Sequence, residues 1–116
     1  MDREQMKIRT KGFAKEVIFL CRKLPSNQEG RLVGSQIFRA GTSVGANYRA
    51  ACRARSKKDF ISKLGIALEE ADETLYWLEI LAETKIVEAN LLTGLKSEAN
   101  ELIAIFVASL NTAQRS

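Results

Sequence analysis

The chain has 116 residues, of which 46% are hydrophobic, so it has the size of one domain and needs neither a metal nor disulfides to fold. It contains no histidine, which excludes Ser-His-Asp and Cys-His catalytic sites, histidine metal ligands and the Glu-x-x-His pairs of di-iron bundles. The net charge of +4 hides an asymmetry, because residues 1–63 carry 15 basic and 5 acidic side chains whereas residues 64–116 carry 3 and 9. A basic half of this kind can meet phosphates or the acidic half of a neighbouring copy.

The first helix is predicted from Phe13, because apolar residues then recur at helical spacing up to Leu24. It should end at Pro25, since proline disfavours helical geometry in the residue before it. Residues 1–12 are polar and basic, and we expect them to be frayed or to extend this helix.

The second helix is predicted for residues 30–53, with an apolar face and a basic face. The apolar face comprises Val33, Ile37, Ala40, Val44, Tyr48 and Ala51. The basic face comprises Arg31, Arg39, Arg49 and Arg53. A helix with these two faces can pack in a core and present cations to solvent.

Gly41 and Gly45 lie inside this helix, where each glycine costs about 1 kcal/mol relative to alanine. Close approach of another helix, either within the bundle or between subunits, would compensate. A phosphate-binding glycine loop is not indicated, because G-x-x-x-x-G-K-[ST] is absent. Asn47 lies between the two faces, and we expect it to bond to a neighbouring helix or, alternatively, to contact a ligand.

The run from Arg53 to Lys58, R-A-R-S-K-K, is the densest positive segment. It is either a solvated turn or a cluster that contacts phosphates. The third helix is predicted for residues 57–84, with Ser56 as its N-cap. Its predicted core seam is Ile61, Leu64, Leu68, Ala71, Leu75, Leu78 and Ala82. Trp77 and Ile80 form a second stripe that indicates a subunit contact.

The fourth helix is predicted from Glu88, with one more apolar face. That face comprises Leu92, Leu95, Ala99, Leu102, Phe106 and Leu110. Short connections between four helices favour an all-α fold, an antiparallel up-down-up-down four-helix bundle formed by residues 1–116 as a single domain. No apolar run reaches the length of a membrane span, so we expect a cytoplasmic protein that does not enter the membrane.

Five segments carry a pattern that covers most of the chain: Leu24-Pro25, residues 36–39, residues 43–47, Ser56 and the stretch from Phe60 to Thr74. Together they resemble the bacterial four helix bundle protein family, whose members are known as reading frames in intervening sequences of large-subunit ribosomal RNA genes. The resemblance covers about residues 13–110 and implies a ring-like homo-oligomer, a pentamer. A related accessory protein of diversity-generating retroelements is a basic pentamer that binds nucleic acid and a reverse transcriptase. The resemblance therefore also implies a possible protein partner for this chain, such as a reverse transcriptase.

One segment departs from the family pattern. Many members have Ile-Pro-Ser-Asn-Ile-Ala-Glu-Gly where this chain has residues 44–51, Val-Gly-Ala-Asn-Tyr-Arg-Ala-Ala. The proline and the acidic residue are missing, so we expect a straighter second helix. Asn47 is retained.

The remaining chemical groups do not indicate an enzyme. The carboxylates at Glu69, Glu70, Asp72 and Glu73 lie mostly off the apolar seam, and we interpret them as a solvated or salt-bridging face, with a bound magnesium ion as the alternative. Cys21 and Cys52 are expected to be free thiols, with a single disulfide as the alternative. No basic partner that would activate either thiol can be identified. We therefore predict no catalytic site, cofactor or metal.

Two functions remain. In the first, the oligomer binds RNA or DNA mostly through phosphate contacts. The predicted contact residues are Arg39, Arg49, Arg53, Arg55, Lys57 and Lys58. In the second, the protein is a scaffold whose arginines pair with the acidic third helix of a neighbouring copy, or with an acidic protein partner. The residues predicted at an oligomer interface are Gly41, Gly45, Asn47, Trp77 and Ile80.

Overall fold

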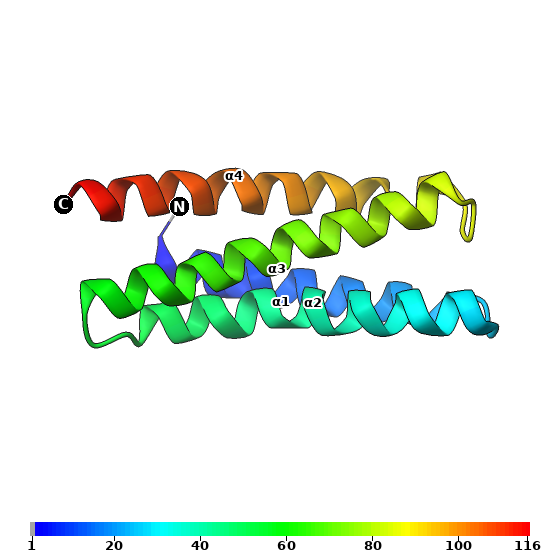
Figure 1. The fold of residues 1–116 in the computed structure, drawn as a ribbon, viewed down its shortest axis with the longest axis horizontal. Helices are drawn as coiled ribbons and strands as arrows, with labels where there is room; N and C mark the ends of the chain where they lie inside the picture. Colours follow the sequence, from blue (N-terminus) through cyan, green and yellow to red (C-terminus); the bar gives the residue numbers. More distant parts are fainter. Residues whose placement is uncertain (1) are drawn as a thin grey trace.

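The computed structural model describes residues 2–116, which form four long helices and a short 3-10 helix. In chain order these are α1 (Arg3–Arg22), α2 (Gln28–Cys52), α3 (Lys57–Glu83), η1 (Ala89–Leu91) and α4 (Thr93–Arg115). Successive helices run antiparallel in a rod that measures 47 × 19 × 19 Å, and both termini lie at the same end as the α2–α3 loop (Figure 1). The predicted all-α four-helix bundle is confirmed.

The first helix is longer than its apolar pattern indicated. Asp2 caps it: the Asp2 carboxylate accepts from the Gln5 backbone N–H at 2.8 Å, and the Gln5 side chain accepts from the Asp2 N–H at 3.1 Å. Met6 and Thr10 are buried. Of the two alternatives for the start of the chain, the frayed one is wrong for residues 2–12 and the extension of the first helix is the one observed, while Met1 lies outside the described residues.

Tight packing in the α1–α2 loop sets where α2 begins. The Asn27 side chain accepts from the Gly30 N–H at 2.9 Å, so the helix starts at Gln28, slightly earlier than predicted. A Cβ on Gly30 would lie only 2.0 Å from the carbonyl oxygen of Pro25. Glycine is therefore required where the loop folds back on the helix.

The core follows the predicted faces of α2 and α4. On α2, Ile37, Ala40 and Val44 are fully buried, and on α4 Leu102 and Phe106 are fully buried. Tyr48 stacks on Phe106, with ring centroids 5.9 Å apart. These contacts join α2 to α4 across the centre of the bundle.

The buried face of α3 is rotated from the prediction. Its buried residues are Leu64, Ala67, Ala71, Thr74, Leu78 and Leu81. The other predicted members of the seam are only half-buried: Ile61, Leu68, Leu75 and Ala82. The reason is that α3 packs against both α2 and α4, so the centre of its buried arc faces the space between these two neighbours.

The connection to α4 is longer than predicted. Lys85 has a φ of 58°, in the left-handed region, and Glu88 precedes η1 instead of opening α4. The last helix begins at Thr93, and Leu92 just before it is fully buried. Within residues 2–116, no helix has both the length and the apolarity needed to cross a membrane.

Candidate nucleic-acid interface

Five of the six predicted phosphate-contacting residues lie at one end of the rod, where α2 ends and α3 begins (Figure 1). We call it the basic end. The Ser56 hydroxyl accepts from the Asp59 N–H at 3.0 Å and fixes the first turn of α3, as predicted. Arg53 and Arg55 therefore lie in the α2–α3 loop, and Lys57 and Lys58 lie in the first turn of α3.

Four cations of the basic end are available to a ligand. Arg49, Arg53, Arg55 and Lys58 are exposed, and none of them forms an ion pair with a carboxylate among residues 2–116. These four residues are called the cation cluster below. Lys57 differs, because its ammonium group donates to the carbonyl oxygen of Ser116.

Charge is concentrated at this end of the bundle. Residues 2–9, 44–63 and 108–116, which build it, carry ten basic and three acidic side chains. The rest of the chain carries eight basic and eleven acidic side chains. Charge is therefore distributed asymmetrically along the rod as well as along the sequence.

Arg39 does not join the cation cluster. Its guanidinium donates to Glu70 at 2.9 Å and also to Glu73, both on the neighbouring α3 of the same chain. The hydrogen bond from Arg39 lowers the pKa of Glu73. Arg39 also lies ten residues from Arg49, about 15 Å along the helix. On the predicted basic face of α2, Arg39 is therefore paired with carboxylates, whereas Arg49 and Arg53 are not.

The two helical glycines pack against α1 of the same chain. A Cβ on Gly41 would lie 2.6 Å from the Val17 side chain, and one on Gly45 would lie 3.2 Å from the Thr10 backbone. The two glycines were expected to allow close approach of a helix either within the bundle or from another subunit, and these contacts with α1 are of the first kind. The Asn47 side-chain amide donates to the Ser43 carbonyl of its own helix at 2.9 Å, and within residues 2–116 it forms no hydrogen bond to another helix, so its expected interhelical bond stays a prediction for a subunit contact.

The predicted outer stripe of α3 is partly covered. Trp77 and Ile80 are half-buried, and the Trp77 indole N–H donates to Glu73 at 3.2 Å. Tyr76, which the sequence analysis passed over, is 54% exposed and meets Trp77 edge to face at 5.0 Å. The exposed apolar surface on this side therefore centres on Tyr76.

The carboxylates and thiols do not form a metal-binding group in the described part of the chain. It contains no group of three or more carboxylates or thiols that could hold a metal ion. Glu70 and Glu73 are engaged by Arg39, in agreement with a salt-bridging face. Cys21 and Cys52 are free thiols. Burial raises the pKa of Cys21, so a smaller fraction of this thiol is in the reactive thiolate form.

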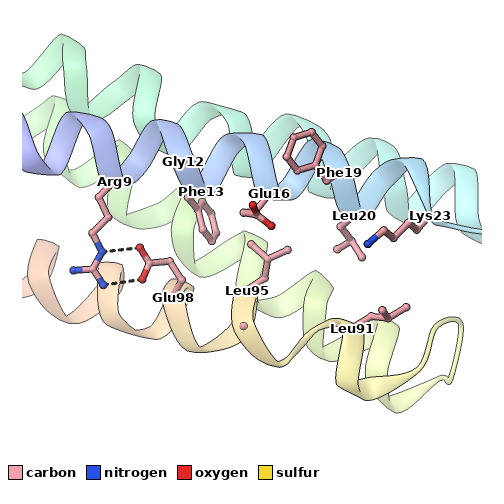
Figure 2. Close-up of a pocket in the computed structure, with 11 residues that line it drawn as sticks. Arg9, Gly12, Phe13, Glu16, Phe19, Leu20, Lys23, Leu91, Leu95 and Glu98 are labelled. Atoms are coloured by element: carbon pink, nitrogen blue, oxygen red, sulfur yellow. Dashed lines mark hydrogen bonds and ion pairs between the residues drawn. The ribbon is translucent and has the colours of Figure 1, made fainter.

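A hollow of about 510 Å³ lies between α1 and α4, which touch at few points. Figure 2 shows Phe13, Leu20 and Leu95 on its walls, with the ion pair of Arg9 and Glu98 bridging the two helices. The Arg9–Glu98 distances are 2.6 and 2.7 Å, and this pairing raises the pKa of Arg9. The hollow is mainly apolar and lies apart from the cation cluster.

A second depression, of about 380 Å³, lies between α1 and α2 and reaches the basic end at Arg49. Lys7, Lys11 and the exposed Ile8 also line it. This groove was not predicted, because no contact residue was expected in residues 1–12, whose helical structure was left open. The lysines at positions 7, 11 and 15 are the signal that was present in the sequence.

Comparison with known proteins identifies the family. The chain matches the model of the 23S rRNA-intervening sequence protein over residues 4–108. It belongs to this family. A crystal structure of a protein with unknown function, from the S23 ribosomal protein family of Bacteroides thetaiotaomicron VPI-5482, shares 35% identity and a TM-score of 0.88, covering 96% of this chain and 99% of that one. No protein with a curated description matches the chain. The family resemblance noted from the sequence is confirmed.

Proposed function

We propose that this protein is a non-enzymatic helical bundle that binds nucleic acid through phosphate contacts made by the cation cluster. The observation that supports the proposal is the group of four exposed, unpaired cations at one end of the rod. Phosphates that replace counterions at such a group gain affinity from counterion release. Arg39 is already paired with two carboxylates, so a phosphate contact at Arg39 would release fewer counterions and add less affinity.

Binding should depend little on base sequence. Two aromatic residues lie near the cluster along the chain. Tyr48 is buried and stacks on Phe106, and the Phe60 ring lies under the Arg3 guanidinium, 5.1 Å from the ring centroid. Arginine and lysine contacts to phosphates fix position but carry no sequence information. The family description refers to an intervening sequence of 23S rRNA, so RNA is the first ligand to test.

The test is binding of labelled single-stranded RNA, duplex RNA and duplex DNA across a salt series, with particle mass measured by light scattering. We expect log affinity to fall linearly with log salt, and Arg49→Glu with Arg53→Glu to weaken binding while leaving the mass unchanged. A control, Arg31→Glu, reverses one exposed and unpaired cation near the opposite end of α2. Unchanged affinity in the double variant would reject the cation cluster as the binding surface.

We further propose that the protein assembles with copies of itself, as the implied five-membered ring would require. The exposed Tyr76, with Trp77 and Ile80 beside it, supports a subunit contact on the outer side of α3. The scaffold alternative, with arginines paired to α3 of a neighbour, is less well supported, because Glu70 and Glu73 already bind Arg39 within the chain.

A further inference from the structure

We propose that the groove between α1 and α2 holds the phosphate backbone of a single nucleic acid strand, running from the cation cluster past Lys7 and Lys11 toward Lys15. This inference rests on the proposed function and names its ligand more closely, as a single strand instead of a duplex. It assigns a role to the first half of α1, which the predicted contact residues did not include.

The floor of the groove is formed by small side chains. Ala14 of α1 and Thr42, Gly45 and Ala46 of α2 line it, and Gly45 permits close approach because a Cβ there would lie 3.2 Å from the Thr10 backbone. Two helices packed this closely leave a channel narrower than their axial separation of about 8–10 Å. A sugar-phosphate strand fits such a channel, whereas a duplex would be confined to its rim.

The rim is positive and continuous with the cation cluster. Arg49 belongs to both surfaces, and Lys7 and Lys11 stand on α1. Glu4 is the acidic residue of the groove, and it pairs with Lys7 at 3.0 Å on the exposed surface, a contact that phosphates can displace at small cost. The rim therefore has an excess of positive charge.

The cations on α1 also have a suitable spacing. Positions 7, 11 and 15 are four residues apart, so the lysines follow one another at about 6 Å along the helix. This is close to the separation of consecutive phosphates on a strand. Lys11 and Lys15 are exposed and form no ion pair within residues 2–116.

Ile8 is the feature that favours a single strand. It is 73% exposed on the rim of the groove, between the lysines, where an isoleucine side chain has no core to fill. An unpaired base can lie against such an apolar side chain, whereas the bases of a duplex are stacked on one another and closed to it. Ile8 thus offers an apolar contact for a base beside the lysines that would contact the phosphates.

The experiment measures fluorescence anisotropy of a labelled RNA oligonucleotide of mixed sequence, single-stranded and as the matching duplex, across a salt series. We expect wild type to bind the single strand more tightly. Lys11→Glu should weaken single-strand binding about tenfold at low salt and flatten the slope of log affinity against log salt by about 0.7. Ala46→Glu, which adds a carboxylate to the floor, should weaken it similarly.

Matched controls distinguish an effect of charge in the groove from an effect of the net charge of the protein. Arg31→Glu makes the same charge change as Lys11→Glu, and Ala104→Glu on the exposed surface of α4 matches Ala46→Glu. Both should stay within about twofold of wild type. Ile8→Ala should weaken single-strand binding with an unchanged salt slope, because it removes no charge. Circular dichroism and thermal unfolding establish that each variant is folded.

The outcomes distinguish the groove from the proposed function itself. If Lys11→Glu and Ala46→Glu behave like their controls, or if duplex binds as tightly as single strand, the groove proposal is overturned. In that case Arg53→Glu, which lies outside the groove, should still weaken binding if the cation cluster is the interface. If wild type binds no nucleic acid at low salt, both proposals fail.

Discussion

Arg39 and Glu70 are joined across α2 and α3 by a hydrogen bond of 2.9 Å, and the same guanidinium also binds Glu73. This relationship decides which arginine of α2 is occupied within the subunit. Arg39 neutralises the acidic middle of α3, while Arg49 and Arg53, farther along the same helix, have no carboxylate partner in the described chain. Position along one helix thus separates a structural arginine from two available for binding.

The same pairing predicts an acid dependence of stability. The Arg39 hydrogen bond lowers the pKa of Glu73 below its usual value of 4.5, so the stabilisation is present above that value and is lost as pH falls through the lower folded-state pKa. We expect Glu73→Gln to reduce the loss of unfolding free energy between about pH 7 and about pH 3 in urea titrations. Glu79→Gln, on an exposed site of α3, is the control. Equal pH profiles for Glu73→Gln and wild type would contradict this role for the pair.

Alanine substitutions at two helical glycines should have opposite effects on stability, because Gly41 packs against α1 and Gly65 does not. Gly41→Ala should destabilise the protein by about 1–3 kcal/mol, because the new Cβ would clash with the Val17 side chain at 2.6 Å. Gly65→Ala on α3 should stabilise it by about 0.5–1 kcal/mol, because a Cβ there meets nothing within 4 Å. Denaturant unfolding measures both. Adding Val17→Ala should partly rescue Gly41→Ala, and a neutral Gly41→Ala would show that the helices can separate freely.

Tyr48 should titrate late. Burial and a hydrogen bond with Cys52 raise the pKa of Tyr48 to about 12. Because the folded-state pKa is raised, the stabilisation is complete below the unfolded value of about 10 and is lost as pH rises toward 12. Ultraviolet absorption of a Tyr76→Phe variant, which leaves Tyr48 as the one tyrosine, measures this directly. A midpoint near 10 in the folded protein would show that the ring is not held in the core.

The outer side of α3 should control self-association. Tyr76→Glu places a charge at the centre of the exposed apolar surface and should lower the particle mass measured by light scattering. Leu32→Glu is the control, because Leu32 is also exposed, at 60%, but lies on α2. Assembly that survives Tyr76→Glu and fails in Leu32→Glu would move the subunit contact to α2.

Much of the fold could be predicted because apolar periodicity and caps act locally. Ile37 and Val44 on α2, and the Ser56 cap of α3, lie where their spacing placed them. The rotated face of α3 could not be predicted in the same way, because α3 packs against both α2 and α4, and the buried arc that includes Ala67 and Thr74 depends on where both neighbours lie. A helix with two neighbours buries an arc set by both of them.

The basic residues of the candidate site could be predicted from the sequence, but which of them form ion pairs could not. The density of positive charge from Arg53 to Lys58 is visible in the sequence, and the α2–α3 turn does present it at one end of the rod. The pairing of Arg39 with Glu70 was not visible, because it joins residues on two helices whose relative register is fixed only in the folded state. The α1–α2 groove was missed for a related reason, since its α1 half depends on the Asp2 cap and on the burial of Met6.

The most direct test compares Arg53→Gln with Arg39→Gln by the salt dependence of RNA affinity. The two variants lose the same charge, but from an unpaired and a paired arginine. We expect Arg53→Gln to flatten the slope of log affinity against log salt by about 0.7 for a single strand, and Arg39→Gln to leave it unchanged. An equal effect of the two variants, or a slope altered only by Arg39→Gln, would contradict binding through the cation cluster.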